Sequence, residues 1–280
     1  MNNRMNNCTI YPMDQGTAEW HGVRSVCFTA SEFAPCFLES RTATQKSARR
    51  KLILKKIREE ILRQGIVYED WETAAKEKEE RAMDYNLAVQ RGRALEPLAR
   101  QEYERITGYK VDQVGFVMHD YGGFGCSPDG IVCVPEKLWD RGFETKAHMP
   151  ELHLAYLLEP DEFLDAHRFQ IHGSMAVTGL DRWDLFGYCP NLPPILLEVK
   201  RDDFTERLLT GIIGMVDEKR RVTEQLMEKW EAWKQLNHER NAPHDPKLFR
   251  RSAQGHLPQP ILPGSKAAIR IVGGKETHSD

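Results

Sequence analysis

Residues 125–146 decide the fold of this chain, and they read Gly125-Cys-Ser-Pro-Asp-Gly130, Ile131-Val-Cys-Val134, a polar turn, and Gly142-Phe-Glu-Thr-Lys146. Residues 127–130 have the composition of a turn, because proline presets φ and glycine tolerates φ > 0. The β-branched run 131–134 predicts a strand, and residues 135–137 and 140–142 separate it from a second strand that begins at Phe143. The stretch therefore predicts a β-hairpin.

The hairpin brings charged side chains together. Side chains alternate between the two faces of a strand, so Glu144 and Lys146 share one face, beside Asp129 at the mouth of the hairpin. One interpretation is a half-exposed hairpin with solvated charges. The other is a cation site, because carboxylate oxygens suit Mg²⁺ or Mn²⁺, which also bind substrate phosphate. Lys146 could then orient or help to deprotonate a nucleophile and offset transition-state charge.

Length and composition set the bounds for the function. A chain of 280 residues that is 40% hydrophobic and 29% charged is ordinary for one large or two small globular domains. The net charge of −3 means that any contact with nucleic acid must come from a local basic patch. The six cysteines include no C-x-x-C pair, so we expect reduced, mostly buried thiols rather than a zinc ribbon. Without an apolar leader or a membrane-length apolar run, the protein is expected to be cytoplasmic, with no membrane association.

The N-terminal third predicts two anion-binding features. Residues 1–14 are expected to form a polar arm. Thr29 or Ser31 can cap a helix that carries Phe33. A capped helix N-terminus with Arg24 nearby suits a phosphate. A simple capped core helix is the alternative interpretation of the same residues. Residues 41–58 contain eight basic residues and no acidic one, so they either face phosphate or form the solvated side of an amphipathic helix. Residues 69–80 are mostly acidic.

Glu96 is a possible third carboxylate of the cation site. It lies in a helical pattern that ends near Gly108, and Pro97 should make that helix kink or begin close to Glu96. A surface glutamate is the alternative interpretation. Residues 109–118 alternate loosely and predict one strand before the hairpin.

The second half of the chain predicts further helices and strands. We expect a helix over residues 163–177, which includes Gln170, then strands over 183–188 and 195–200 and a long helix from Phe204 to about Asn237. Gly211 and Gly214 could interrupt the long helix. Residues 241–280 lack periodicity and are expected to form a flexible tail, which leaves a single domain over residues 15–240.

Four blocks, in order, resemble lambda exonuclease and the YqaJ-like viral recombinase family, within the nuclease superfamily known for its Pro-Asp…(Asp/Glu)-x-Lys motif. The blocks are Trp20-His-x-x-Arg24 with Thr29-Ala-Ser-Glu32; Gly92-x-x-x-Glu96; Cys126-Ser-Pro-Asp-Gly130 with Glu144-x-Lys146; and Gln170-x-x-x-Ser174-Met-x-Val-Thr178. The resemblance covers roughly residues 15–237. Two departures are Ala147-His148, where the lambda-like sequence has Cys-Pro, and His172, where it has a second glutamine. They leave the position of the motif glutamine, Gln170 or His172, open.

The resemblance implies a restriction-endonuclease-like α/β core with a mixed central β-sheet flanked by helices. It further implies a two-ion Mg²⁺ site, for which Mn²⁺ can substitute, and digestion of one strand of linear double-stranded DNA from its 5′ end. The implied partners are a single-strand annealing protein and two further copies of the chain in a trimer. By residue, the resemblance assigns the metal carboxylates to Glu96, Asp129 and Glu144, the catalytic lysine to Lys146, the motif glutamine to Gln170, and the DNA end to Arg24, Ser31 and Arg41.

Two other functions fit the same residues. An endonuclease on the same core, such as a restriction or junction-cleaving enzyme, would cut a covalently closed circle, whereas an end-dependent exonuclease would leave it intact. A non-catalytic protein that binds DNA ends could retain the fold with a vestigial site. The complete set of charged residues argues against the vestigial site, since charged side chains without a packing role are readily lost.

Overall fold

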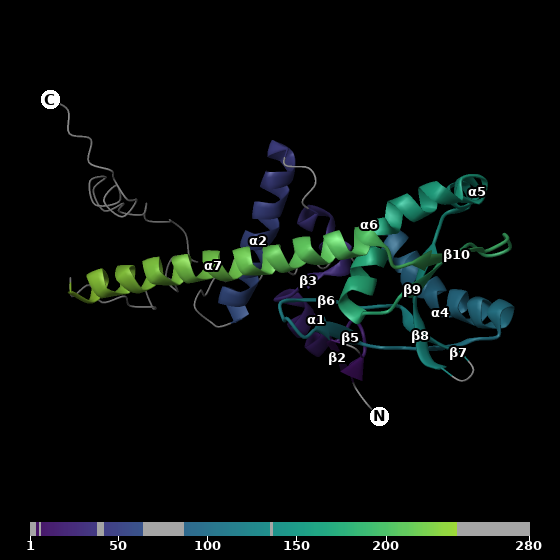
Figure 1. Cartoon of the computed structure of the whole chain (residues 1–280), viewed down its shortest axis with the longest axis horizontal. Helices are drawn as coiled ribbons and strands as arrows, with labels where there is room; N and C mark the ends of the chain where they lie inside the picture. Colours follow the sequence, from purple (N-terminus) through teal and green to yellow (C-terminus); the bar gives the residue numbers. More distant parts are fainter. Residues whose placement is uncertain (1–3, 6, 38–41, 64–86, 135–136, 240–280) are drawn as a thin grey trace, which may run out of the picture. The chain divides into compact units, whose positions relative to one another are not determined.

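The computed structural model describes residues 4–5, 7–37, 42–63, 87–134 and 137–239 (Figure 1). The chain divides into two units, Met1–Leu226 and Met227–Asp280, and every site residue discussed below belongs to the first unit. In these described ranges, no helix is both long and apolar enough to cross a membrane. Arg41, the acidic stretch 69–80 and the tail 241–280 lie outside the described residues.

A five-stranded mixed sheet carries the predicted hairpin. Its order is β10-β9-β8-β7-β4. Its strands are β4 (Lys110–Asp112), β7 (Gly130–Val134), β8 (Lys137–Ala147), β9 (Arg182–Tyr188) and β10 (Ile195–Lys200). β7 and β8 pair antiparallel, with Gly130 opposite Phe143, so the hairpin is confirmed. β8 begins at Lys137, so residues 140–142 belong to the strand and were wrongly predicted as a turn.

Two helices cover opposite faces of this sheet, α4 (Leu87–Thr107) and α6 (Pro160–Thr178). Phe186 of β9 packs against Tyr103 of α4, with ring centroids 5.6 Å apart. Its neighbour Leu185 belongs to a separate buried cluster that contains Ile171 of α6. Because adjacent strand residues point to opposite faces, the two helices lie on the two sides of the sheet. This arrangement confirms the predicted mixed sheet flanked by helices.

A second mixed sheet, which the sequence analysis did not predict, has the order β1-β2-β5-β6-β3. Its strands are β1 (Arg4–Met5), β2 (Cys8–Tyr11), β3 (Phe28–Thr29), β5 (Phe116–His119) and β6 (Phe124–Cys126). β2 pairs along its length with β5, and Cys8 and Ile10 are buried. The prediction of a polar arm over residues 1–14 is therefore wrong for β2.

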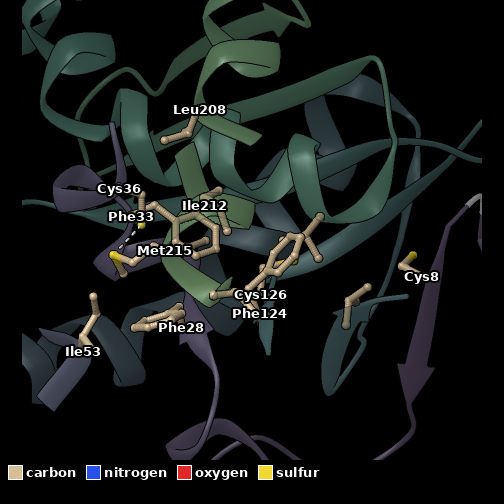
Figure 2. Close-up of a cluster of buried hydrophobic side chains, with 14 of the residues drawn as sticks. Cys8, Phe28, Phe33, Cys36, Ile53, Phe124, Cys126, Leu208, Ile212 and Met215 are labelled. Atoms are coloured by element: carbon tan, nitrogen blue, oxygen red, sulfur yellow. Dashed lines mark hydrogen bonds between the residues drawn. The ribbon is translucent and has the colours of Figure 1, made fainter. Parts of the chain in front are cut away.

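The largest buried cluster joins the second sheet to α2 (Ala43–Arg63) and α7 (Asp203–Glu239). Figure 2 shows Leu208, Ile212 and Met215 of α7 in this cluster, with the sulfur atoms of Met215 and Cys36 facing each other at 3.6 Å. The helix predicted from Phe204 is confirmed, and its two glycines do not interrupt it. All six cysteines are free, and only Cys133 is not buried.

Two local predictions were wrong, and one alternative of a third is excluded. The helix expected after Thr29 is two 3₁₀ turns, η1 (Ala30–Glu32) and η2 (Ala34–Cys36). Of the two alternatives at Pro97, a helix start near Glu96 is excluded, because α4 begins at Leu87 and contains Pro97; a kink at Pro97 stays a prediction. Residues 109–118 form β4 and β5 of different sheets; at Gly115 between them, a Cβ atom would lie 2.1 Å from the carbonyl oxygen of Met13.

Candidate active site

The predicted charged residues line one cavity of about 480 Å³ at β8. β8 supplies Glu144 and Lys146, the turn before β7 supplies Asp129, and α4 supplies Glu96. The lining residues are Gly92, Glu96, Asp129, Glu144, Thr145, Lys146, Ala147, His148, Leu152, Tyr156 and His167. The three carboxylates that the sequence placed near the hairpin are thus brought together, and none of them is a fully exposed surface residue.

Glu144 is the most deeply buried of the three carboxylates, with only 3% of its surface exposed. The ammonium of Lys146 donates a hydrogen bond to its Oε1 atom, which confirms that the two side chains share a face of β8. The Nε2 atom of Gln170, on α6, donates to the same oxygen at 2.6 Å. Glu144 Oε1 is therefore held from two elements.

Asp129 is fixed to the same strand through the backbone. Its Oδ2 atom accepts a hydrogen bond from the amide of Thr145 at 2.8 Å. Burial, and next the negative charge of Glu144, raise the pKa of Asp129 well above its ordinary value. The pKa of Glu96 is also raised, first by burial and also by Glu144, although Arg100 at 3.1 Å opposes the shift. Burial is thus the main cause of both pKa shifts, and repulsion between the carboxylates adds to it, so a bound cation would stabilise their ionised forms.

The carboxylates also change the pKa of Lys146. Burial alone would lower the pKa of the lysine, but the charges of Glu144 and Asp129 and the hydrogen bond from Lys146 to Glu144 outweigh burial, so the pKa is raised. The side chain is therefore an ammonium at neutral pH. Neutralising the carboxylates would remove the charge that holds this proton.

The carboxylate set fits a hard divalent cation. The Oε2 atom of Glu144 is buried and has no hydrogen-bond partner among the described residues, so it is available as a ligand. Three carboxylates with one lysine leave the negative charge that Mg²⁺ or Mn²⁺ requires. Within the described parts of the chain, however, no three His, Cys, Asp or Glu side chains already form a metal-binding cluster. One oxygen of each carboxylate accepts a hydrogen bond, from Arg100 to Glu96, from Thr145 to Asp129 and from Lys146 to Glu144.

Arg24 and Ser31 lie close together, as their predicted shared role requires. Arg24, at the end of α1 (Ala18–Ser25), donates to the hydroxyls of Ser31 and Ser127, each at 3.3 Å, and stacks over Trp20. Burial lowers the pKa of the guanidinium, which the charge of Glu32 partly offsets. Ser127 also accepts from Trp20 at 3.1 Å and lies two residues before Asp129. Arg24 is thus bonded to the segment that carries Asp129.

The predicted anion site at a helix N-terminus is not present at Ser31. η1 has only three residues, so it lacks the aligned peptide dipoles that the argument needs. The amide of Thr29 is instead bonded by Glu32 at 3.3 Å. Any phosphate affinity here must come from Arg24 and the hydroxyl groups.

The structure distinguishes Gln170 from His172. Gln170 reaches Glu144, whereas His172 is buried on another side of α6, with its Nδ1 atom 2.7 Å from the hydroxyl of Thr205. Of the two residues, Gln170 is therefore the one that contacts a carboxylate of this cavity. Three residues near the carboxylates were missed: His148, His167 and Arg100. Only the i,i+4 spacing of Arg100 from Glu96 was a usable signal in the sequence.

The chain is similar to a known domain family and to solved structures. The YqaJ-like viral recombinase domain matches residues 19–181. Among solved structures, the chain is similar to an alkaline exonuclease (LHK-Exo) from Laribacter hongkongensis, with 26% sequence identity and a TM-score of 0.58, over 78% of this chain and 100% of that one. The same exonuclease in complex with dAMP matches with 26% identity and a TM-score of 0.57, over the same shares of the two chains. None of the curated proteins compared matches the chain.

Proposed function

The chain belongs to the YqaJ-like viral recombinase domain family and has a restriction-endonuclease-like fold, and from this premise we propose that it is a metal-dependent deoxyribonuclease. Its substrate is linear double-stranded DNA, of which it digests one strand from 5′ to 3′ and exposes 3′ single strands for recombination. The observation that carries the proposal is the convergence of Glu96, Asp129 and Glu144 beside Lys146 in one cavity. The similarity to an alkaline exonuclease supports the same reaction.

Glu96, Asp129 and Glu144 would hold Mg²⁺, in a two-ion site, with Mn²⁺ as a substitute. When bound, the ions supply an activated water and stabilise the attacking and leaving oxygens of the phosphodiester. The fit rests on the excess of negative charge and on the unpartnered Oε2 atom of Glu144.

The other side chains orient the carboxylates and the DNA end, and Lys146 can transfer a proton. Lys146 is held next to Glu144, where an ammonium offsets the charge that develops on the phosphate. Once the carboxylates are neutralised, its proton is released more readily, so the amine can also accept a proton from the nucleophile. Gln170 fixes Glu144 from α6, and Arg24 with Ser31 binds the terminal 5′ phosphate that distinguishes an end from an internal position.

The proposal extends to the partners that the family resemblance implies. The chain would act as a homotrimer on DNA and deliver its product to a single-strand annealing protein. These partners rest on the family alone, whereas the chemistry rests on the cavity. Sedimentation of the full chain tests the trimer independently of activity.

Digestion of an end-labelled linear duplex, with and without Mg²⁺, tests the proposed function. We expect Mg²⁺-dependent release of mononucleotides from the 5′ end and no cutting of a covalently closed circle. Asp129→Asn should abolish digestion while DNA binding persists, because a two-ion site retains little activity after the loss of one ligand. As a matched control, Asp165→Asn alters an exposed aspartate of α6 that does not line the cavity. Cutting of the circle would point to an endonuclease, and full activity of Asp129→Asn would contradict the metal assignment.

A further inference from the structure

The cavity has a second wall of different chemistry. α5 (Pro150–Leu158) contributes Leu152 and Tyr156, His148 follows the end of β8, and α6 contributes His167. These side chains are apolar or aromatic, whereas the carboxylates and Lys146 are charged. A volume of about 480 Å³ lies in the range of small-molecule sites. The cavity therefore combines a charged wall with an aromatic wall.

His167 presents a flat ring to this cavity. It lies one helical turn before Gln170 on α6, so the two residues share a face of the helix. Its ring packs edge-on against Phe163 at 5.3 Å and nearly parallel to His148 at 6.4 Å. Burial, and then the charges of Lys146 and His148, lower the pKa of His167 to about 3, so the ring is neutral at physiological pH. A neutral ring has a π-face for stacking without attracting phosphate.

His148 supports the same interpretation through its missing partners. It is 7% exposed, and neither ring nitrogen has a hydrogen-bond partner in the described structure. Its ring contacts Tyr156 and Phe163, each at 5.0 Å in an edge-to-face arrangement. A buried polar group without a partner is costly and rare in native proteins, so these two nitrogens call for partners from outside the chain, such as water, an ion or a ligand. A ligand with polar atoms at the edge of a flat ring suits this wall.

We propose that His148, Tyr156 and His167 form a nucleobase-binding wall, which holds the base of the nucleotide whose phosphate lies at the carboxylates. This inference rests on the proposed nuclease function and adds a contact to the base. Stacking on aromatic side chains accepts every base, because each base has a π-face. The wall would therefore position the nucleotide without imposing a sequence preference.

Mononucleotide binding tests the wall without requiring catalysis. Calorimetry with the full chain, with and without Mg²⁺, compares dAMP with 2-deoxyribose 5-phosphate, which lacks the base. We expect wild-type protein to prefer dAMP by roughly 10- to 100-fold, the range for one stacked base. His167→Ala should lose most of this preference, His167→Phe should keep most of it, and Asp165→Ala, on the exposed side of α6, should leave it unchanged.

A DNA substrate provides the second measurement. A linear duplex with an abasic sugar at the first or the second 5′ position should be digested more slowly than normal duplex by wild-type protein. The same change should matter little to His167→Ala, since the contact is already lost. Equal wild-type affinity for dAMP and the sugar phosphate would contradict the proposed nucleobase-binding wall. An unchanged base preference in His167→Ala would contradict it as well. Absence of digestion with an intact base preference would instead reject the nuclease function, so the two failures are distinguishable.

Discussion

The exposed basic face of α2 provides a quantitative test of how DNA approaches the site. Lys46, Arg50 and Lys51 are exposed, and none of them has an ion-pair partner among the described residues. Arg49, in the same run, is different, because it bonds Glu218 of α7 at 2.7 Å and is only 17% exposed. The first three residues are therefore available to phosphate, and Arg49 is part of the packing between helices.

α2 also lies beside the elements that carry the predicted 5′-phosphate residues. Arg63 donates to the carbonyl oxygen of Gly22 in α1 at 3.2 Å. Lys55 and Lys56 pair with Glu32 of η1, next to Ser31. A duplex whose end reaches Arg24 and Ser31 would thus pass near α2.

The expected change follows from counterion release. Each cation that contacts a phosphate contributes about 0.9 to the slope of log K against log salt. Replacing Lys46, Arg50 and Lys51 by glutamine should therefore reduce the magnitude of the slope by about 2.7. Between about 50 and 200 mM salt, wild-type affinity should fall about 40-fold more than the affinity of the variant.

Fluorescence anisotropy with a labelled linear duplex in Ca²⁺, at several salt concentrations, measures both slopes. A matched control replaces Arg105, Lys110 and Lys200, three strongly exposed cations on other elements, and should leave the slope nearly unchanged. Arg49→Gln should lower the free energy of unfolding and leave the slope of log K against log salt nearly unchanged. Equal slopes for wild-type protein and the α2 variant would show that these charges are a solvated helix face.

Three further predictions concern the chemical step, the DNA end and pH. Lys146→Ala should lower the single-turnover rate by about 10²–10³-fold. Lys146→Arg should not restore the rate, because a guanidinium cannot act as a compact acid or base. An unchanged rate in Lys146→Ala would exclude this role of the lysine. Removing the 5′ phosphate should slow digestion by wild-type protein but matter little in an Arg24→Ala, Ser31→Ala double variant; strictly additive losses would remove the phosphate pocket. Burial lowers the pKa of His148 from 6.5 to about 4 and that of His167 to about 3, so the unfolded chain binds these protons first as the pH falls below 6.5, and each histidine should cost about 2 kcal/mol of stability by pH 5. Urea unfolding at pH 7.5 and 5.0 measures this loss, which His148→Leu should diminish; an equal loss in both proteins would assign it to other groups.

The hairpin and its charges were predictable because they depend on local rules. Turn residues, a β-branched run and side-chain alternation are properties of neighbouring residues, so the shared face of Glu144 and Lys146 followed from the sequence. The helix with Gln170 followed from its periodicity. The family match over residues 19–181 confirms the resemblance that these blocks suggested.

The errors arose where distant parts of the chain decide the local structure. Residues 8–11 are not strongly apolar, yet β2 forms because β5 offers a partner more than a hundred residues later. The helix expected after Thr29 stops as 3₁₀ turns, with Pro35 inside η2 and Phe33 packed against Gly173 of α6, where a Cβ atom would lie 2.3 Å from the ring. Neither contact is visible in a local pattern.

The aromatic wall was missed for a related reason. A single histidine in a helical pattern is usually a packed residue, so nothing distinguished His167 from other residues of its helix. Its place in the cavity depends on how α5 and α6 pack beside β8. The sequence also left Glu96 ambiguous, because only the packing of α4 against the sheet brings it to Asp129 and Glu144.

The position of α6 explains why one site can receive groups from so many elements. Residues 171–178 of this helix are all buried, because one side packs on the central sheet while another, with Val177, packs in the cluster of the second sheet. A helix held by two cores has little freedom to shift, so Gln170 and His167 keep fixed positions at its less buried half. Precise placement of site groups needs such support from packing. The second sheet, which holds none of the three carboxylates, therefore contributes to the site by fixing the helix that presents Gln170 to Glu144.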